Sequence, residues 1–310
     1  MRTAFFQALA EAAAADPDIV LIAGPEGLPA VEAFGTALPE DRFYGISGSD
    51  ASVMGVAVGM AMNEHRVFVY SLAPFVTLHA LEFLRNDVCP AQLPVVVAGV
   101  GAGYASGHQT FTHPALDDVA VMRALPGMTV IAPADPSEVH AAVRSLAKHD
   151  GPAYLRIADD GEPVFGNDAP PFAVGRARLL RDGRDVTMIG CGRILTAALD
   201  AAATLEKSGV SARVIDMATV APVDADAIRN ACRDTRALMT IEEHGTTGGL
   251  GAAVGEVLAT MPTHPPLKKL GFQKALTARA GNREYLLAED GLNGDGIVRQ
   301  TRALLDSLRA

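Results

Sequence analysis

The sequence has few cysteines and lacks long hydrophobic runs. Its three cysteines, Cys89, Cys191 and Cys232, form no CxxC pair and have no histidine at metal-ligand spacing. This argues against a disulfide framework and against a zinc site held by cysteine. The most continuous apolar stretch, residues 93–100, is far shorter than the roughly 18 residues of a membrane span. We therefore expect a cytoplasmic protein with no membrane partner and no metal ligands of its own.

Positive charge is also scarce. The chain has 26 Lys and Arg against 36 Asp and Glu, which gives a formal net charge of −10. Such a surface repels nucleic acid, so a nucleic-acid-binding protein is not expected. The hydrophobic fraction of 49% is sufficient for large buried cores. At about 150 residues per domain, 310 residues predict two domains.

Short apolar runs alternate with helical patterns along the chain, which is typical of βαβ units and parallel sheets. The fold class predicted is therefore α/β, with two doubly wound domains in series. We assign residues 1–157 to the first domain, 158–182 to a Pro-, Gly- and Asp-rich linker, and 183–310 to the second domain. Strands are predicted at residues 19–23, 67–71, 94–100, 128–132, 153–157, 186–190, 212–215 and 238–241.

Local motifs give weaker signals. Asp50 precedes a helix of small residues, and a helix N-cap is the simplest interpretation. The segment 294–296 (Gly-Asp-Gly) is interpreted as a turn. His108 and His113 share a polar, glycine-rich loop after an apolar strand, where imidazoles are placed to meet a ligand.

Several segments in fixed order carry a family resemblance. They are DRFYGISGSD, SLAPF with LEFLRNDV, LPVVVAGVGAG, GHQTFTH, MRALPGMTVIAPAD, GPAYLRI, DVTMIGCG, SARVIDMATVAPVD and EEHGTTGGLGAAV. Together they resemble the C-terminal half of the transketolase family, in the form where the enzyme is split into two chains. The resemblance implies a pyrimidine-binding domain followed by a transketolase C-terminal domain.

In that family, thiamine diphosphate binds between a pyrimidine-binding domain and a diphosphate-binding domain that also holds Mg²⁺. The second of these is not encoded in this chain. The resemblance therefore implies a diphosphate-binding partner subunit, with self-association into a dimer of heterodimers. The partner would contribute most of the Mg²⁺ site.

The resemblance also assigns individual residues. Phe75 matches the aromatic residue that stacks on the aminopyrimidine ring, and Leu78 falls where many relatives have a Tyr near the same ring. His113 matches an active-site histidine that meets the substrate. His108 replaces part of an acidic pair in the same loop and is a candidate substrate contact. Arg156 matches an arginine that holds a substrate phosphate in relatives, although an ordinary ion pair at a strand end is an equal alternative.

Asp50 is the most consequential departure from the family. Relatives have a Glu at this position, which hydrogen-bonds the pyrimidine and promotes deprotonation of the cofactor's thiazolium carbon. Asp is one methylene shorter, about 1.5 Å of reach. Gly101 stands where relatives often have a second His, and the segment 23–26 (Ala-Gly-Pro-Glu) lacks the particular acidic residue that relatives often have after the first strand. These departures predict a site with altered substrate preference.

The function implied is that of a transferase subunit with small-molecule substrates. It would move a two-carbon ketol or acyl unit from a keto donor to an aldehyde-type acceptor, with Asp50 and His113 as catalytic residues. A 2-oxoacid dehydrogenase beta chain and a deoxyxylulose-phosphate-synthase-like enzyme remain alternatives. From a different class, a catalytically silent scaffold or regulatory subunit would also fit the Asp50 substitution.

Overall fold

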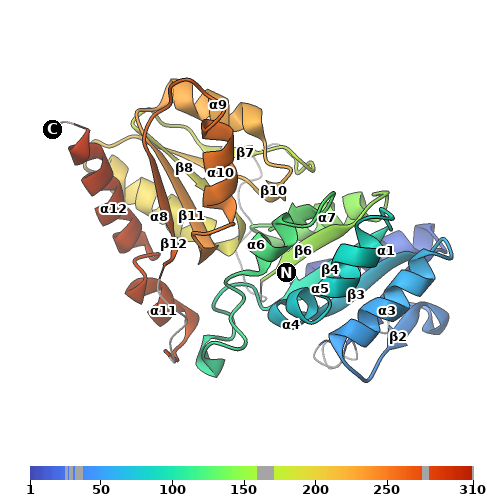
Figure 1. The fold of residues 1–310 in the computed structure, drawn as a ribbon. Coiled ribbons are helices and arrows are strands. Elements are labelled where there is room, and N and C mark those ends of the chain that lie inside the picture. The colour runs from blue at the N-terminus through green and yellow to red at the C-terminus, as the bar shows by residue number, and fades with distance from the viewer. Residues whose placement is uncertain (25–26, 28–30, 32–37, 159–170, 274–278, 309–310) are drawn as a thin grey trace.

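The computed structural model describes residues 1–24, 27, 31, 38–158, 171–273 and 279–308. Over these residues the chain forms two α/β units, each built on one sheet (Figure 1). Both sheets are mainly parallel, which confirms the predicted fold class. Residues 159–170 of the predicted linker, and two of the residues 23–26 noted above, lie outside the described residues.

The first sheet has the strand order β10-β5-β6-β4-β3-β1-β2. Neighbouring strands are parallel except for β10, which is antiparallel to β5. The strands are β1 (Ile19–Ala23), β2 (Phe43–Gly45), β3 (Arg66–Leu72), β4 (Val95–Val100), β5 (Thr129–Ile131), β6 (Ala153–Ile157) and β10 (Thr219–Ala221).

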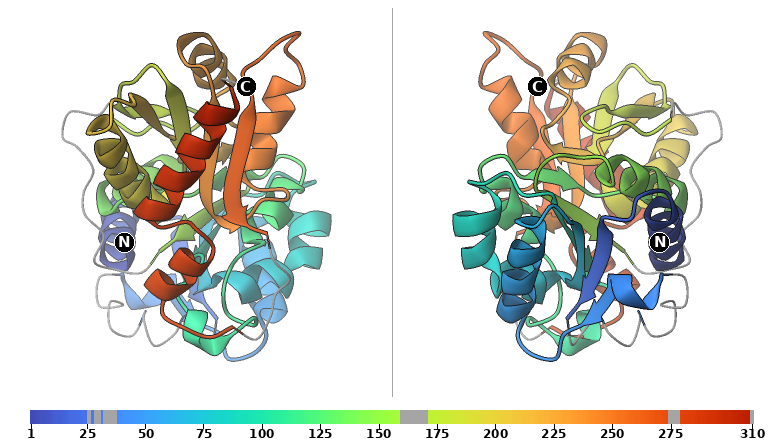
Figure 2. Two further views of the ribbon diagram at one scale, coloured as in Figure 1. Left: turned by 90° about the vertical axis from the view of Figure 1, so that its left-hand side faces the viewer. Right: turned by 90° about the vertical axis from the view of Figure 1, so that its right-hand side faces the viewer.

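Helices cover both faces of this sheet, which explains why its central strands are continuously apolar. In β1, Val20 and Ile22 enter one core cluster, whereas Leu21 and Ala23 enter the other. Helices α1 and α3 lie on opposite sides of the sheet (Figure 2). The helical elements are α1 (Arg2–Ala15), η2 (Glu40–Arg42), α3 (Asp50–Ala61), α4 (Ala73–Leu78), α5 (Leu81–Phe83), η3 (Leu84–Val88), η4 (Gly107–Gln109), α6 (Asp118–Arg123) and α7 (Pro136–Leu146).

The second sheet has the order β12-β11-β8-β9-β7, with only the edge strand β7 antiparallel to its neighbour. Its strands are β7 (Arg178–Arg181), β8 (Val186–Gly190), β9 (Ala212–Asp216), β11 (Leu238–Gly245) and β12 (Leu267–Phe272). Its helices are η5 (Gly192–Ile194), α8 (Leu195–Glu206), α9 (Ala225–Asp234), α10 (Leu250–Leu258), α11 (Arg283–Glu289) and α12 (Gly294–Ser307). Strand β7 lies entirely within the range 158–182 assigned to the linker.

The two units are joined through one strand and one core. Strand β10 belongs by sequence to the second half, yet Thr219 and Ala221 pair with β5 of the first sheet. One apolar cluster also contains Met122 of α6 and Val254 of α10. The carboxyl ends of β6, β8 and β11 therefore face one another across the junction, and polar residues meet there.

One turn prediction was wrong. Residues 294–296 form the first turn of α12, because the Asn293 side chain accepts a hydrogen bond from the Gly296 backbone N–H at 2.9 Å and caps the helix. Within the described part of the chain, no helix combines the length and apolar character that crossing a bilayer requires.

Candidate functional site

Asp50 begins α3 but does not cap it. Ser49 is the N-cap, and its hydroxyl accepts from the Ser52 backbone N–H at 3.3 Å, so the N-cap interpretation of Asp50 was wrong by one residue. The Asp50 carboxylate is buried, and its Oδ1 accepts from Ser71 Oγ at 2.7 Å. The residue that the resemblance aligns with the family's glutamate therefore has a buried carboxylate. A side chain near the end of β3 donates a hydrogen bond to it.

Phe75 lies on the short helix α4, directly after β3, between two imidazoles. Its ring centroid is 5.4 Å from that of His79, with the planes tilted by 31°, and 5.1 Å from that of His113, in edge contact at 84°. His113 also contacts Thr112 Oγ1 through Nδ1 at 2.8 Å. The fold thus brings together Phe75 and His113, two of the predicted site residues, and adds His79 to them.

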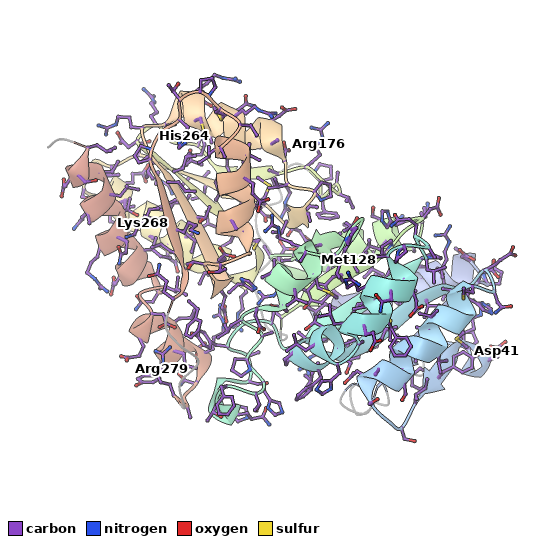
Figure 3. The ribbon with its side chains drawn as sticks, in the orientation of Figure 1. Asp41, Met128, Arg176, His264, Lys268 and Arg279 are labelled. Carbon is purple, nitrogen blue, oxygen red and sulfur yellow. The ribbon has the colours of Figure 1, made fainter. Side chains whose placement is uncertain are left out.

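A hollow of about 390 Å³ opens beside these residues, within the size range of small-molecule sites. Its described lining is Pro74, Phe75, Leu78, His79, Phe111, Thr112, Pro114, Leu116, Asp117 and Phe272. Leu78 is 45% exposed and forms part of the wall. Phe272 comes from the second unit, where Arg279, labelled in Figure 3, lies over its ring at 5.8 Å.

His79 was missed at the sequence level. Among the described residues it is the histidine that lines the hollow, and its Nδ1 lies 3.7 Å from Asp50 Oδ2. The available signal was its spacing of four residues from Phe75, which places both side chains on one face of a helix. His108, in contrast, is exposed on η4 and is not among the described lining residues. Its substrate role stays a prediction.

Arg156 lies away from this hollow, at the end of β6, where it is almost fully buried. Its guanidinium donates to Asp118 Oδ2 at 2.7 Å, to the Ala115 carbonyl at 2.7 Å and to the Glu243 carbonyl at 3.1 Å. Burial alone would raise the pKa of Asp118, but the Arg156 and His244 charges, together with the hydrogen bonds from Arg156 and Tyr154, outweigh burial and lower it. The ion-pair alternative is therefore realised, and a phosphate-binding role stays a prediction.

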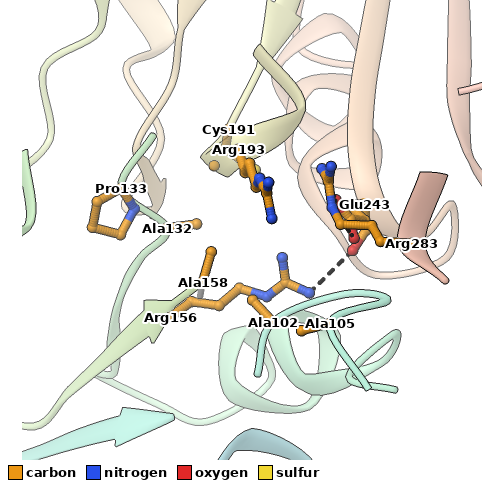
Figure 4. Close-up of a pocket in the computed structure, with 11 residues that line it drawn as sticks. Ala102, Ala105, Ala132, Pro133, Arg156, Ala158, Cys191, Arg193, Glu243 and Arg283 are labelled. Carbon is orange, nitrogen blue, oxygen red and sulfur yellow. Dashed lines mark hydrogen bonds and ion pairs between the residues drawn. The ribbon is translucent and has the colours of Figure 1, made fainter. Parts of the chain in front are cut away.

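Arg156 also lines a small cavity between the two units (Figure 4). Arg193 from η5 and Arg283 from α11 reach the same space, whose volume is about 20 Å³. Glu243 of β11 contributes its carboxylate, which pairs with Arg283. This cavity has room for about one water molecule, so it forms part of the junction between the units.

The described contacts of residues 242–245 (EEHG) are structural. Glu242 accepts from the backbone N–H groups of Leu250 and Gly251 at 2.7 and 2.8 Å and thereby caps α10. Glu243 accepts from the Tyr104 backbone N–H at 2.8 Å. His244 is buried beside Glu242; burial would lower its pKa, but the carboxylates nearby raise it. The run thus fixes the second unit against the first.

Two family models match the chain. The transketolase pyrimidine-binding domain matches residues 1–159, and the transketolase C-terminal domain matches residues 175–297. The chain belongs to the transketolase family. The order of the two domains confirms the resemblance that the sequence segments indicated.

Several relatives match this chain over most of their own length. An apulose-4-phosphate transketolase subunit of Phocaeicola vulgatus is 34% identical over 300 residues, which cover 96% of this chain and 95% of the relative. A putative transketolase C-terminal section of Methanocaldococcus jannaschii is 33% identical, over 91% of this chain and 88% of the relative. A structure described as a split gene transketolase, inactive beta4 tetramer, has a TM-score of 0.88 at 33% identity, with 98% and 97% covered. This transketolase-family chain is therefore similar to proteins named as a subunit, a C-terminal section and a split gene product of transketolase.

Proposed function

We propose that this chain is the pyrimidine-binding subunit of a two-chain, thiamine diphosphate-dependent transferase. The enzyme moves a two-carbon ketol or acyl unit from a keto donor to an aldehyde-type acceptor, and it requires a separate diphosphate-binding subunit. The observation that carries the proposal is a hollow of small-molecule size lined by Phe75 and His79, with the buried Asp50 carboxylate 3.7 Å from His79 Nδ1.

The residues present fit an aminopyrimidine ring. Phe75 offers an aromatic ring at the wall of the hollow, and flat heterocycles bind such rings by stacking and burial. Asp50 supplies negative charge beside His79, without a guanidinium partner among the described contacts. Leu78 and Phe111 add exposed apolar surface that a ring and a partner subunit would cover.

Thiamine diphosphate, when bound, would supply the nucleophilic carbon needed to cleave a carbon–carbon bond of the donor. The chain's own residues bind, orient and move protons. Phe75 would hold the ring, Asp50 would supply negative charge on that side of the site, and His113, in edge contact with Phe75, would exchange a proton with a substrate oxygen. Mg²⁺ would be bound mainly by the partner, and assembly as a dimer of heterodimers would complete the site.

Calorimetric titration tests this proposal. Thiamine diphosphate with Mg²⁺ is titrated into this chain alone and into its mixture with the companion diphosphate-binding chain. We expect binding only in the mixture, because each chain holds part of the cofactor. A stable complex that binds no cofactor would instead favour the silent scaffold. A donor screen then separates ketose cleavage from the oxoacid decarboxylation of the alternative enzymes.

Replacing Phe75 by alanine is expected to weaken cofactor binding by the two-chain complex about tenfold, since an aromatic contact contributes about 0.5–1.5 kcal/mol beyond its buried area. The same titration measures it. Tyr285→Ala, which removes a half-exposed ring from α11, is the matched control and should bind normally. Equal affinities for the wild type and Phe75→Ala would contradict the assignment of Phe75.

Replacing His113 by alanine is expected to lower kcat of the complex by about 10²–10⁴-fold, the usual contribution of a positioned proton-transfer group. Cofactor affinity should change little, because Phe75 remains in place. Steady-state kinetics measures the loss, with the exposed His264→Ala of the second unit as control. Turnover close to that of the wild type would remove His113 from the catalytic residues.

A further inference from the structure

One oxygen of the Asp50 carboxylate is enclosed by protein. Oδ1 accepts from Ser71 Oγ at 2.7 Å, and a Cβ added at Gly24 would lie only 3.2 Å from the same oxygen. The other oxygen, Oδ2, lies 3.7 Å from His79 Nδ1. The oxygen that Ser71 does not hold therefore faces an imidazole.

His79 lies between this carboxylate and the hollow. The Asp50 side chain is 7% exposed and does not line the hollow, whereas the His79 side chain is 57% exposed and does. The imidazole also packs against the Phe75 ring at 5.4 Å, which limits its orientation. A ligand ring placed against Phe75 would thus meet His79 before it could meet Asp50.

We propose that His79 is the group that contacts the nitrogen edge of the aminopyrimidine ring and that Asp50 is its positioning residue. The proposal rests on the proposed function and names a further catalytic residue for it. The imidazole supplies the reach that an aspartate lacks relative to a glutamate, about 1.5 Å. Asp50 and the histidine that it orients would together take the place of the longer glutamate side chain.

The proposed proton transfer from His79 to the aminopyrimidine ring needs no further reactant. In the imidazolium form, His79 Nδ1–H points to Asp50 Oδ2, and Nε2 gives its proton to the ring nitrogen. The positive charge moves with that proton, and Asp50 keeps its own charge. The present separation of 3.7 Å exceeds a hydrogen bond, and catalytic contacts in ligand-free proteins commonly shorten when the ligand binds.

A second histidine–carboxylate pair provides a matched control. His140 Nε2 lies 3.1 Å from Glu11 Oε2 on the far side of the first sheet, where α7 packs against α1. The Glu11 side chain is 59% exposed, so this pair lacks the buried carboxylate of the Asp50 pair. Variants of His140 and Glu11 report what an ordinary surface pair does.

The first experiment records imidazole ¹⁵N spectra of the full chain, with His79 assigned from its loss in His79→Gln. The tautomer of a neutral imidazole follows the hydrogen bond that one nitrogen makes. We expect the neutral His79 ring to carry its proton on Nδ1, and Asp50→Ala to move it to Nε2. The His140 signals should not respond to Asp50→Ala. A His79 tautomer that is the same with and without the Asp50 carboxylate overturns the proposal.

The second experiment uses the two-chain complex. His79→Ala should lower kcat by about 10²-fold with a smaller change in KM, and His140→Ala should not. Adding Asp50→Glu to His79→Ala should recover most of the loss, because the longer carboxylate then reaches the ring directly. Full turnover in His79→Ala, or no recovery in the double variant, overturns this inference alone. A complex that binds no thiamine diphosphate overturns the proposed function and this inference with it.

Discussion

Replacing Asp118 by asparagine is expected to destabilise the protein by about 3–5 kcal/mol, the usual cost of breaking a buried ion pair by removing one partner. Asp118 is fully buried, and its carboxylate accepts from Arg156 at 2.7 Å and from the Tyr154 hydroxyl at 2.6 Å. An asparagine leaves the guanidinium of Arg156 uncompensated in the junction between the two units.

Urea unfolding at pH 7 measures this loss, with Asp226→Asn as the control. Asp226 pairs with Arg229 on the surface of α9, where both side chains are largely exposed, so its loss should change the free energy of unfolding by less than about 1 kcal/mol. If Asp118→Asn were as mild as this control, Arg156 would be stabilised by other groups. That result would favour a role for Arg156 in holding a substrate anion.

The central strands were predictable because burial on both faces demands continuous apolar sequence. Strands β1, β6 and β8 have the bounds that their apolar runs indicate. The short strands β2 and β10 have three residues each, and their pairing depends on neighbours that are distant in sequence. No local pattern marks such strands.

The site was predictable only in part, for a related reason. Phe75 and His113 were found because whole segments match a family, and the fold places their rings 5.1 Å apart. His79 is marked by nothing local except its spacing from Phe75. The proposed role of His79 depends on Asp50, 29 positions away in the chain. It also depends on which carboxylate oxygen is not hydrogen-bonded by Ser71. Such information is present only in three dimensions.

A buried acidic pair at the junction carries the other large prediction. Glu138 of α7 and Asp216 of β9 are both about 1% exposed, and they share one guanidinium. Arg178 Nε lies 2.8 Å from Glu138 Oε1, and its Nη2 lies 2.9 Å from Asp216 Oδ2. One positive charge balances one carboxylate, so the second carboxyl group keeps its proton. Burial, reinforced by the Asp216 charge, raises the pKa of Glu138 to about 9.

The sign of the pH dependence follows from this raised pKa. The unfolded chain loses the Glu138 proton near its ordinary value of 4.5, whereas the folded protein keeps it until about pH 9. The stabilising contribution is therefore complete below pH 4.5 and is lost as the pH rises through 9. Between these limits the free energy of unfolding should fall by about 1.4 kcal/mol per pH unit from this group.

Glu138→Gln removes that slope, because an amide has no proton to lose in this range. We expect the free energy of unfolding of the variant, relative to the wild type, to increase steadily with pH from about 6 to 8.5. Glu206→Gln, whose carboxylate is 71% exposed and paired with Arg181, should give a difference that does not vary with pH. Parallel stability curves for Glu138→Gln and the wild type would mean that both carboxylates are ionised in the folded protein.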